Sequence, residues 1–170
     1  GYDKNLLVPF AESLPLSRWT SEWLPHARGF GAAHATPSLR LGAFRIATPI
    51  CYETIVSGFV RRMLREGDAN LIVSLANDGW FGDSQEPRLH LALARLRAIE
   101  QRRFVVRATN SGISAVIDPL GRVLEQTPLL APATLRATVR ALEVESPYQR
   151  FGEWPGQIAA LATVALLVAR

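Results

Sequence analysis

The sequence predicts a layered α/β fold, because strand-like and helix-like segments alternate through its middle. Apolar runs at 41–50 and 70–75 indicate strands, and stretches with helical spacing of apolar residues at 55–66 and 87–103 indicate helices. A series of short strands follows the second helix, which is typical of helices packed on a sheet. The length of 170 residues suits one domain, and a hydrophobic content of 48% is enough for a sizeable core.

The first predicted strand, 41–50, ends at Cys51, the one cysteine of the chain, and a helix is expected over 55–66. A thiol between a strand and a helix occupies a position where α/β enzymes hold nucleophiles, since the turned backbone leaves N–H groups free for an oxyanion. The alternative is a small core residue, because free cysteine is among the most buried residue types. A lone cysteine excludes an internal disulfide.

The second predicted strand, 70–75, leads into a loop over 77–87 that is rich in Gly, Asp and Ser but carries Trp80 and Phe81. Large aromatic side chains usually belong to the core. In such a polar loop they are costly to expose unless they meet a ligand, a lipid or a protein. The following helix is expected to place one apolar face on the sheet, formed by Leu89, Leu93, Leu96 and Ile99.

Four more strands are expected before the C-terminal region, at 104–108, 113–117, 123–124 and 134–142. Turn residues separate the first three: Asn110-Ser111-Gly112 follows one strand and Pro119-Leu120-Gly121-Arg122 follows the next. The last strand is predicted from its alternation of apolar and polar residues.

The chain closes in an apolar run, 158–169, with no charge before Arg170. Trp154 and Pro155 precede it and fit an interfacial anchor and the first turn of a helix. Such a helix would reach about 18 Å, against about 30 Å for a bilayer core. Because no side of the run is polar, we expect the truncated start of a transmembrane helix rather than a buried amphipathic one.

Basic residues outnumber acidic ones by 19 to 15, and they form mild clusters at 61–62, 95–97 and 102–103. Such clusters could meet phospholipid headgroups or nucleic acid, although a solvated helix face is the simpler reading. The sequence lacks the arginine–aromatic alternation of single-strand binders, and we expect no nucleic-acid partner.

The three histidines, His26, His34 and His90, have no metal-ligand spacing with one another or with acidic residues, so they are expected to be structural or on the surface. The sequence also lacks a phosphate loop and a dinucleotide fingerprint. We therefore expect neither a metal nor an organic cofactor.

Six blocks of sequence carry a resemblance to a known family. They are Tyr2-Asp3-Lys4-Asn5-Leu6-Leu7-Val8-Pro9-Phe10-Ala11-Glu12, Ile50-Cys51-Tyr52-Glu53, Asn77-Asp78-Gly79-Trp80-Phe81-Gly82, Arg97-Ala98-Ile99-Glu100, Arg107-Ala108-Thr109-Asn110-Ser111-Gly112-Ile113-Ser114 and Tyr148-Gln149-Arg150-Phe151-Gly152-Glu153-Trp154-Pro155. Together they resemble the carbon–nitrogen hydrolase (nitrilase) superfamily and, within it, the apolipoprotein N-acyltransferases. The lysine and cysteine blocks indicate only the superfamily, whereas the aromatic loop and the terminal apolar helix indicate the acyltransferase branch.

The resemblance implies a Glu-Lys-Cys triad. Cys51 would be the nucleophile, Lys4 would stabilise its thiolate and then the oxyanion, and the N–H of Tyr52 would be the second oxyanion donor. The family places the general-base Glu upstream of the Lys, beyond Gly1, so the 170 residues alone are expected to be inactive. Without the motif, Lys4 would read as an ordinary solvated lysine.

The remaining site residues also rest on the resemblance. Glu12 resembles a second acid that holds Lys4 and the attacking group in place, and Glu53 resembles a residue beside the nucleophile. Neither is the upstream base. Glu53 joins Tyr52 and Asn77 in the expected oxyanion and substrate-binding set, together with the aromatic pair Trp80 and Phe81, which would line a pocket for acyl chains.

In terms of architecture, the resemblance implies a partial α-β-β-α sandwich of the nitrilase type. Residues 1–150 would be the C-terminal part of a carbon–nitrogen hydrolase domain, and 151–170 a linker with the start of a transmembrane helix. The expected place is the inner membrane of a bacterium, with the catalytic domain on the periplasmic side and the full-length protein a monomer.

In terms of activity, the resemblance implies transfer of a fatty acyl chain from a phospholipid to the N-terminal amino group of a diacylglyceryl-cysteine apolipoprotein, through a cysteine thioester. Two alternatives stay open. One is a soluble amidase that uses the same triad with water as acceptor, and the other is a fragment that binds lipid without catalysis.

Overall fold

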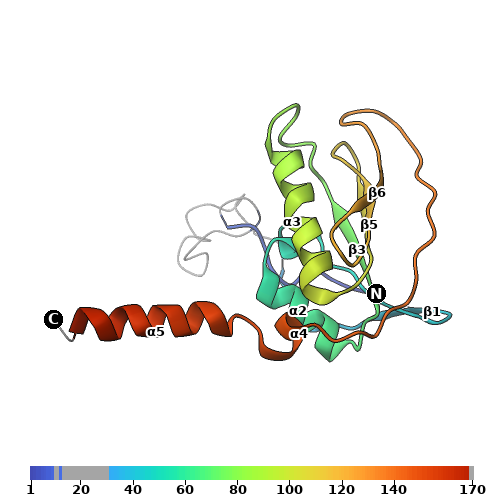
Figure 1. Ribbon diagram of the computed structural model, residues 1–170. Helices are drawn as coiled ribbons and strands as arrows, with labels where there is room; N and C mark the ends of the chain where they lie inside the picture. Colours follow the sequence, from blue (N-terminus) through green and yellow to red (C-terminus); the bar gives the residue numbers. More distant parts are fainter. Residues whose placement is uncertain (10–11, 13–30, 169–170) are drawn as a thin grey trace.

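The computed structural model describes residues 1–9, 12 and 31–168, and a six-stranded sheet lies at its centre (Figure 1). The strands follow one another in chain order: β1 (Leu39–Leu41), β2 (Phe44–Ala47), β3 (Leu71–Ala76), β4 (Val105–Thr109), β5 (Ala115–Ile117) and β6 (Val123–Gln126). The helical segments are the 3-10 helix η1 (Cys51–Thr54), α2 (Ser57–Glu66), α3 (Glu86–Gln101), α4 (Pro147–Phe151) and α5 (Trp154–Val168). Phe10, Ala11, His26, Ala169 and Arg170, which the sequence analysis used, lie outside the described residues.

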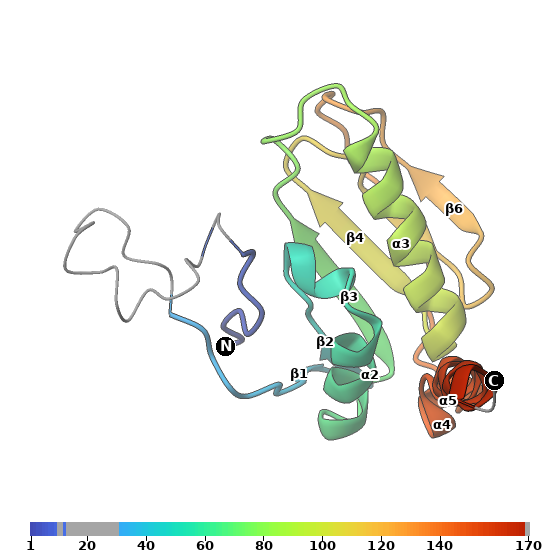
Figure 2. The same ribbon diagram turned by 90° about the vertical axis from the view of Figure 1, so that its left-hand side faces the viewer.

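The middle of the sheet is parallel and both of its sides are antiparallel. β2, β3 and β4 run parallel, and β1–β2, β4–β5 and β5–β6 are antiparallel pairs. Parallel neighbours need a crossover, so α2 joins β2 to β3 and α3 joins β3 to β4. Figure 2 shows both helices on the same face of the sheet. The described residues thus form one helix layer on one sheet layer, which is the α-β half of the expected sandwich.

The hydrophobic core lies between the two helices and the sheet. α2 contributes Val60, Met63 and Leu64, which lie on one face of the helix, and they pack with Ile72 of β3 and Val105 of β4. All five side chains are fully or almost fully buried, and burial of each contributes about 1.5–3 kcal/mol. This packing fixes the two helices on the sheet, and the site is built at the other, carboxyl ends of the parallel strands.

Helix α3 lies close to the predicted range, but it packs through a different face from the one that the sequence predicted. The buried side carries the small residues Ala94 and Ala98. The predicted apolar face is largely exposed, with Leu89, Leu96 and Ile99 all outside the core. That prediction was wrong because a neighbouring face of the helix, with Leu91, Ala94 and Ala98, packs into the core.

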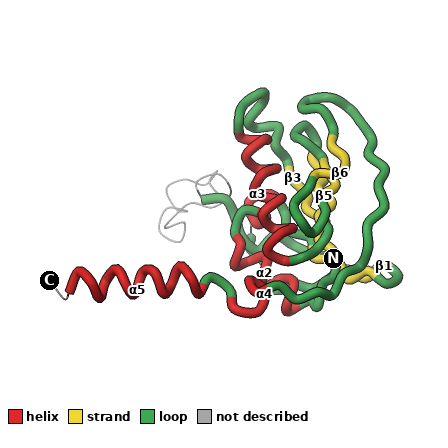
Figure 3. Tube along the Cα trace, in the orientation of Figure 1, coloured by secondary structure: helices red, strands yellow, loops and turns green. Residues whose placement is uncertain are grey.

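Two strand predictions also differ from the structure. The segment 41–50 is divided between β1 and β2, because Gly42 adopts a φ of +58° and turns the chain. The predicted strand 134–142 was wrong, and Figure 3 draws this stretch as loop. The stretch runs past the sheet, where the N–H of Leu142 donates to the carbonyl of Asn70 at 3.2 Å. An alternating pattern does not make a strand where a ladder of backbone partners is lacking.

Arginines fasten the segment that leads to the C-terminal helices. Arg61 of α2 donates to the carbonyl oxygens of Tyr148, Gln149 and Arg150 at 3.1, 2.9 and 3.1 Å. Arg103 donates to the carbonyl of Val144 at 2.6 Å. Two members of the basic clusters therefore donate hydrogen bonds to backbone carbonyl groups of the same chain. The sequence indicated either a surface that binds anions or a solvated helix face.

The last helix, α5, has exposed side chains along its whole described length and contains no charged residue. Its 15 residues correspond to about 22 Å of helix. Among residues 1–9, 12 and 31–168, no helix has both the length and the apolar character that a membrane crossing would require. The start of a transmembrane helix therefore stays a prediction.

Candidate active site

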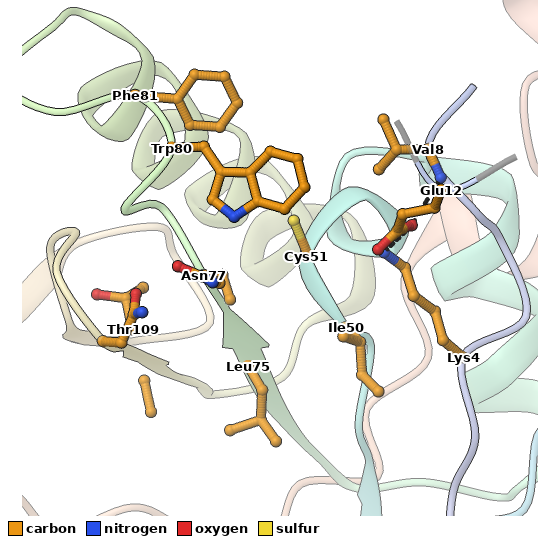
Figure 4. A pocket seen from close by; sticks show the side chains of 13 residues that line it. Lys4, Val8, Glu12, Ile50, Cys51, Leu75, Asn77, Trp80, Phe81 and Thr109 are labelled. Atoms are coloured by element: carbon orange, nitrogen blue, oxygen red, sulfur yellow. Dashed lines mark hydrogen bonds and ion pairs between the residues drawn. The ribbon is translucent and has the colours of Figure 1, made fainter. Parts of the chain in front are cut away.

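A pocket of about 750 Å³ lies at the carboxyl ends of the parallel strands (Figure 4). Open α/β sheets bind ligands at this edge, because every parallel strand delivers its following loop there. Its lining comes from five segments: Lys4, Val8 and Glu12; Ile50 and Cys51; Leu75, Ala76 and Asn77; Trp80 and Phe81; and Ala108, Thr109 and Asn110. The pocket thus joins chemically reactive side chains to a wall that is mostly apolar.

Cys51 lies at the centre of this pocket, directly after the segment that continues β2. Ile50 still pairs with Leu75 of β3, and the chain then turns at Cys51, which has a φ of +52°. A side chain other than glycine in the left-handed region is uncommon, and such strain is concentrated at functional sites. The thiol is free and half-buried, between a strand and a helix as the sequence indicated.

Glu53 ties the lysine segment to the turn that carries Cys51. Its fully buried carboxylate accepts hydrogen bonds from the Tyr2 hydroxyl at 2.8 Å and from the backbone N–H groups of Asn5, Leu6 and Ile50 at 2.5, 2.9 and 2.8 Å. Burial and the bond to this carboxylate raise the pKa of Tyr2, which stays a neutral donor. Glu53 lies outside the pocket lining, so its geometry is that of a brace behind the site.

Lys4 and Glu12 form an ion pair at one side of the pocket. The Lys4 Nζ lies 2.6 Å from Glu12 Oε2, and the same oxygen accepts the N–H of Val8 at 2.8 Å. Burial alone would raise the pKa of Glu12, but the hydrogen bonds from Lys4 and Val8 lower it below its ordinary value. The ionised carboxylate therefore holds the ammonium group in position, whereas the part of the pair in catalysis stays a prediction.

The aromatic loop, residues 77–82, forms the wall of the pocket opposite Lys4 and Glu12. Trp80 is 70% exposed and Phe81 47% exposed, and both line the same pocket as Cys51 (Figure 4). Asn77 also lines it, and its Oδ1 accepts the N–H of Gly79 at 3.1 Å. Tyr52 is half-buried and is not among the residues that line the pocket, so its role as an oxyanion donor stays a prediction.

Sequence reasoning missed a buried polar network behind the aromatic loop. Arg107 Nη2 donates to Asp78 Oδ2 at 2.6 Å, and His90 Nδ1 lies 3.2 Å from Asp78 Oδ1 and 3.6 Å from Glu86 Oε1. Asp78, Glu86 and His90 are spaced as metal ligands could be, but the guanidinium already balances the Asp78 charge. An arginine inside an apolar strand was the signal that could have revealed the network, since a buried charge needs a partner.

Comparison with known proteins gives the chain a family and a set of relatives. The carbon–nitrogen hydrolase family model matches residues 1–147. The chain is 37% identical over 176 residues to the apolipoprotein N-acyltransferase of Pseudomonas putida, with 99% of this chain and 34% of that protein covered. It is 36% identical to the protein of the same name from Azotobacter vinelandii, with 97% and 32% covered. The chain therefore spans about a third of the length of these curated relatives.

The fold has a solved counterpart as well. The structure of Saccharomyces cerevisiae Nit3, a member of branch 10 of the nitrilase superfamily, superposes with a TM-score of 0.54. The match covers 62% of this chain and 41% of Nit3 at 17% sequence identity. At that identity the likeness concerns the fold alone, and it identifies the mixed sheet with its helix layer as nitrilase-like.

Proposed function

Because this chain belongs to the carbon–nitrogen hydrolase family, we propose that it is the part of an acyltransferase that carries the nucleophile. The reaction would move a fatty acyl chain from a phospholipid to the N-terminal amino group of a diacylglyceryl-cysteine apolipoprotein. The observation that carries this proposal is the pocket in which Cys51 and Lys4 meet an apolar wall with Trp80 and Phe81. The names of the relatives support the same activity.

In the first half-reaction, the Cys51 sulfur attacks the ester carbonyl carbon of the phospholipid. Its proton passes to the general base of the triad that the family resemblance implies. The carbonyl oxygen becomes an oxyanion, which the Lys4 ammonium and the Tyr52 N–H would stabilise. When the intermediate collapses, the carbon–oxygen bond breaks, the lysophospholipid alkoxide takes up a proton and leaves, and a thioester remains on Cys51.

In the second half-reaction, the amino group of the apolipoprotein attacks the thioester carbonyl carbon. The new amide bond forms as the carbon–sulfur bond breaks, Cys51 leaves as a thiolate, and the proton that the amine loses passes to the general base of the triad. Glu12 would act by holding Lys4 toward both oxyanions, and Glu53 by keeping the lysine segment beside the nucleophile. Two half-reactions on one nucleophile predict ping-pong kinetics.

The apolar wall favours an acyl chain over a small amide as the group that the pocket receives. Val8, Ile50, Leu75 and the aromatic pair offer no charge to a polar substrate. The exposed apolar helix α5 is consistent with contact to lipid, because a large exposed apolar surface indicates a lipid or protein partner. We place the domain at the outer face of the bacterial inner membrane on the strength of the resemblance.

The decisive experiment is to incubate the complete gene product with phospholipid that carries a labelled acyl chain. We expect protein-bound label that neutral hydroxylamine releases, as a thioester requires, and that Cys51→Ala abolishes. Cys51→Ser should also lose turnover, because a serine hydroxyl ionises far less readily than a thiol. Label that persists in Cys51→Ala would refute the proposal. Release of free fatty acid without transfer to an amine acceptor would support hydrolysis by water instead.

A further inference from the structure

Asp78 lies at the junction of two segments that wall the pocket. One is the aromatic loop, 77–82, and the other is the turn 110–112 that follows β4. A Cβ added to Gly112 would come within 2.0 Å of Asp78 Oδ2, and a Cβ on Gly79 would lie 3.1 Å from the Ser111 hydroxyl. The loop and the turn therefore pack against each other through the Asp78 carboxylate, with glycine where the approach is closest.

Arg107 holds this carboxylate from behind. Besides the bond to Asp78, its Nε donates to the carbonyl of Ile113 at 3.3 Å, just beyond the turn 110–112. One guanidinium thus binds the base of the loop and the end of the turn. The side chains of Arg107 and Asp78 are 0% and 1% exposed, and neither lines the pocket.

The electrostatics of the pair agree with this geometry. Burial would raise the pKa of Asp78, but the hydrogen bond from His90 and the charge of Arg107 lower it. A buried carboxylate that lost its cation would be left unpaired, and the surrounding segments would have to move to hydrate it. The segments in direct contact with the Asp78 carboxylate are the loop and the turn, so these would be displaced first.

We propose that Arg107 is a positioning residue that, through Asp78, holds the aromatic loop against the turn 110–112 and so shapes the pocket for a long acyl chain. The inference rests on the proposed function, because it concerns how the pocket accepts the group that Cys51 receives. Arg107 itself neither contacts the substrate nor transfers a proton. Its effect falls on chain recognition, and the reactivity of Cys51 toward a short acyl donor is left largely intact.

Two activated esters separate these effects: p-nitrophenyl palmitate and p-nitrophenyl acetate. With either one, the Cys51 thiolate attacks the ester carbonyl carbon, p-nitrophenolate leaves, and the burst of p-nitrophenolate gives the acylation rate. Arg107→Lys keeps the charge but cannot reproduce the forked contacts of a guanidinium. In the complete gene product in detergent, it should lower the palmitate-to-acetate rate ratio by roughly tenfold or more, since misplacement of a binding wall by about 1 Å can cost that much.

Arg103→Lys is the matched control, since Arg103 is also a buried arginine but donates to the carbonyls of Ala69 and Val144 away from the pocket. It should leave the ratio unchanged even where it lowers stability. A double-mutant cycle adds a second readout. If Arg107 acts through the loop, Arg107→Lys should change the ratio little once Trp80 has been replaced by alanine.

Equal losses with both esters, matching those of Arg103→Lys, would overturn the inference, as would full additivity with Trp80→Ala. If Arg107→Lys does not accumulate in folded form, Asp78→Asn supplies the same comparison with the side-chain shape retained. The esters also separate this inference from the proposed function. Acylation of Cys51 by esters but not by phospholipid would reject the proposed donor, while the rate ratio would still decide the role of Arg107.

Discussion

Glu53 sets the distance between the two reactive segments of the site, because one carboxylate receives hydrogen bonds from both. The Tyr2 hydroxyl and the Asn5 and Leu6 N–H groups come from the lysine side, and the Ile50 N–H comes from the strand before Cys51. A neutral glutamine in its place would turn one acceptor oxygen into a donor facing other donors. At the scale of one residue, the site therefore depends on a buried brace as much as on its exposed reactive groups.

Trp80 is the residue whose role is simplest to test. We expect Trp80→Ala to lower acyl transfer strongly while changing the melting temperature little, because the indole is 70% exposed and lines the pocket. A tryptophan in a core would instead cost roughly 3–5 kcal/mol on truncation. Transfer rate per folded molecule and thermal unfolding are measured on the same sample.

The control for this substitution is Leu120→Ala, which removes an exposed apolar side chain outside the pocket lining. It should leave both quantities near their original values. A large loss of stability in Trp80→Ala, with normal activity per folded molecule, would instead identify Trp80 as a packing residue.

At the scale of the elements, the contact between α2 and α4 fixes the path of the chain toward α5. The last carbonyl groups of a helix lack partners within the helix, and a cation near them also favours the negative end of its dipole. Arg61 supplies that cation to α4, and Ser146 caps the other end by accepting the N–H of Gln149. α2 begins shortly after Cys51, so the same helix connects the nucleophile to the exit of the chain.

Arg61→Ala should therefore destabilise this contact by about 1–3 kcal/mol, the cost of leaving partly buried carbonyl groups without their charged donor. Faster proteolytic cleavage near α4 and a lower midpoint in urea are the expected results. Arg65→Ala, an exposed position on the same helix, is the matched control and should change neither. Equal cleavage rates in the two variants would contradict the role assigned to Arg61.

At the scale of the whole molecule, the pKa values of the partly buried carboxyl groups are shifted in two opposite directions. Asp78 and Glu12 have partners strong enough to lower the pKa of each carboxyl despite burial. Glu86 and Glu100 are dominated by burial, which raises the pKa of each above the ordinary value of 4.5. Ionised Asp78 and Glu12 therefore stabilise the folded state, whereas ionised Glu86 and Glu100 destabilise it.

These directions predict a stability maximum on the acid side of neutrality. As pH falls from 7, Glu86 and Glu100 take up protons more readily in the folded state, so stability rises. Below about pH 4, Asp78 and Glu12 take up protons more readily in the unfolded state, and stability is lost through their lowered folded pKa values.

Urea midpoints measured between pH 7 and pH 3 test this profile. Glu100→Gln should reduce the rise of the urea midpoint between pH 7 and pH 5, and the fall of the midpoint at lower pH should remain. A urea midpoint that falls steadily from pH 7 downward would show that Glu86 and Glu100 do not control stability between pH 7 and pH 5.

The order of strands and helices through the middle of the chain was predictable because it depends on local properties. Apolar spacing, glycine turns and the position of Cys51 after an apolar run all act within a few residues, and β3, α2, β4 and the turn at Cys51 agree with them. For this order the amino-acid sequence by itself was sufficient. The resemblance also pointed to Lys4, Cys51 and Trp80, which the structure places around one pocket, whereas their catalytic and binding roles stay predictions.

The tertiary structure decided what depends on contacts between distant segments. The buried face of α3 carries Leu91, Ala94 and Ala98, whereas the sequence pattern alone favoured the face with Leu89 and Leu96. The stretch 134–142 is not a strand because no ladder partner is provided for it within the described residues. The pairing of Arg107 with Asp78 joins positions 29 residues apart, and only the fold determines which buried charges meet.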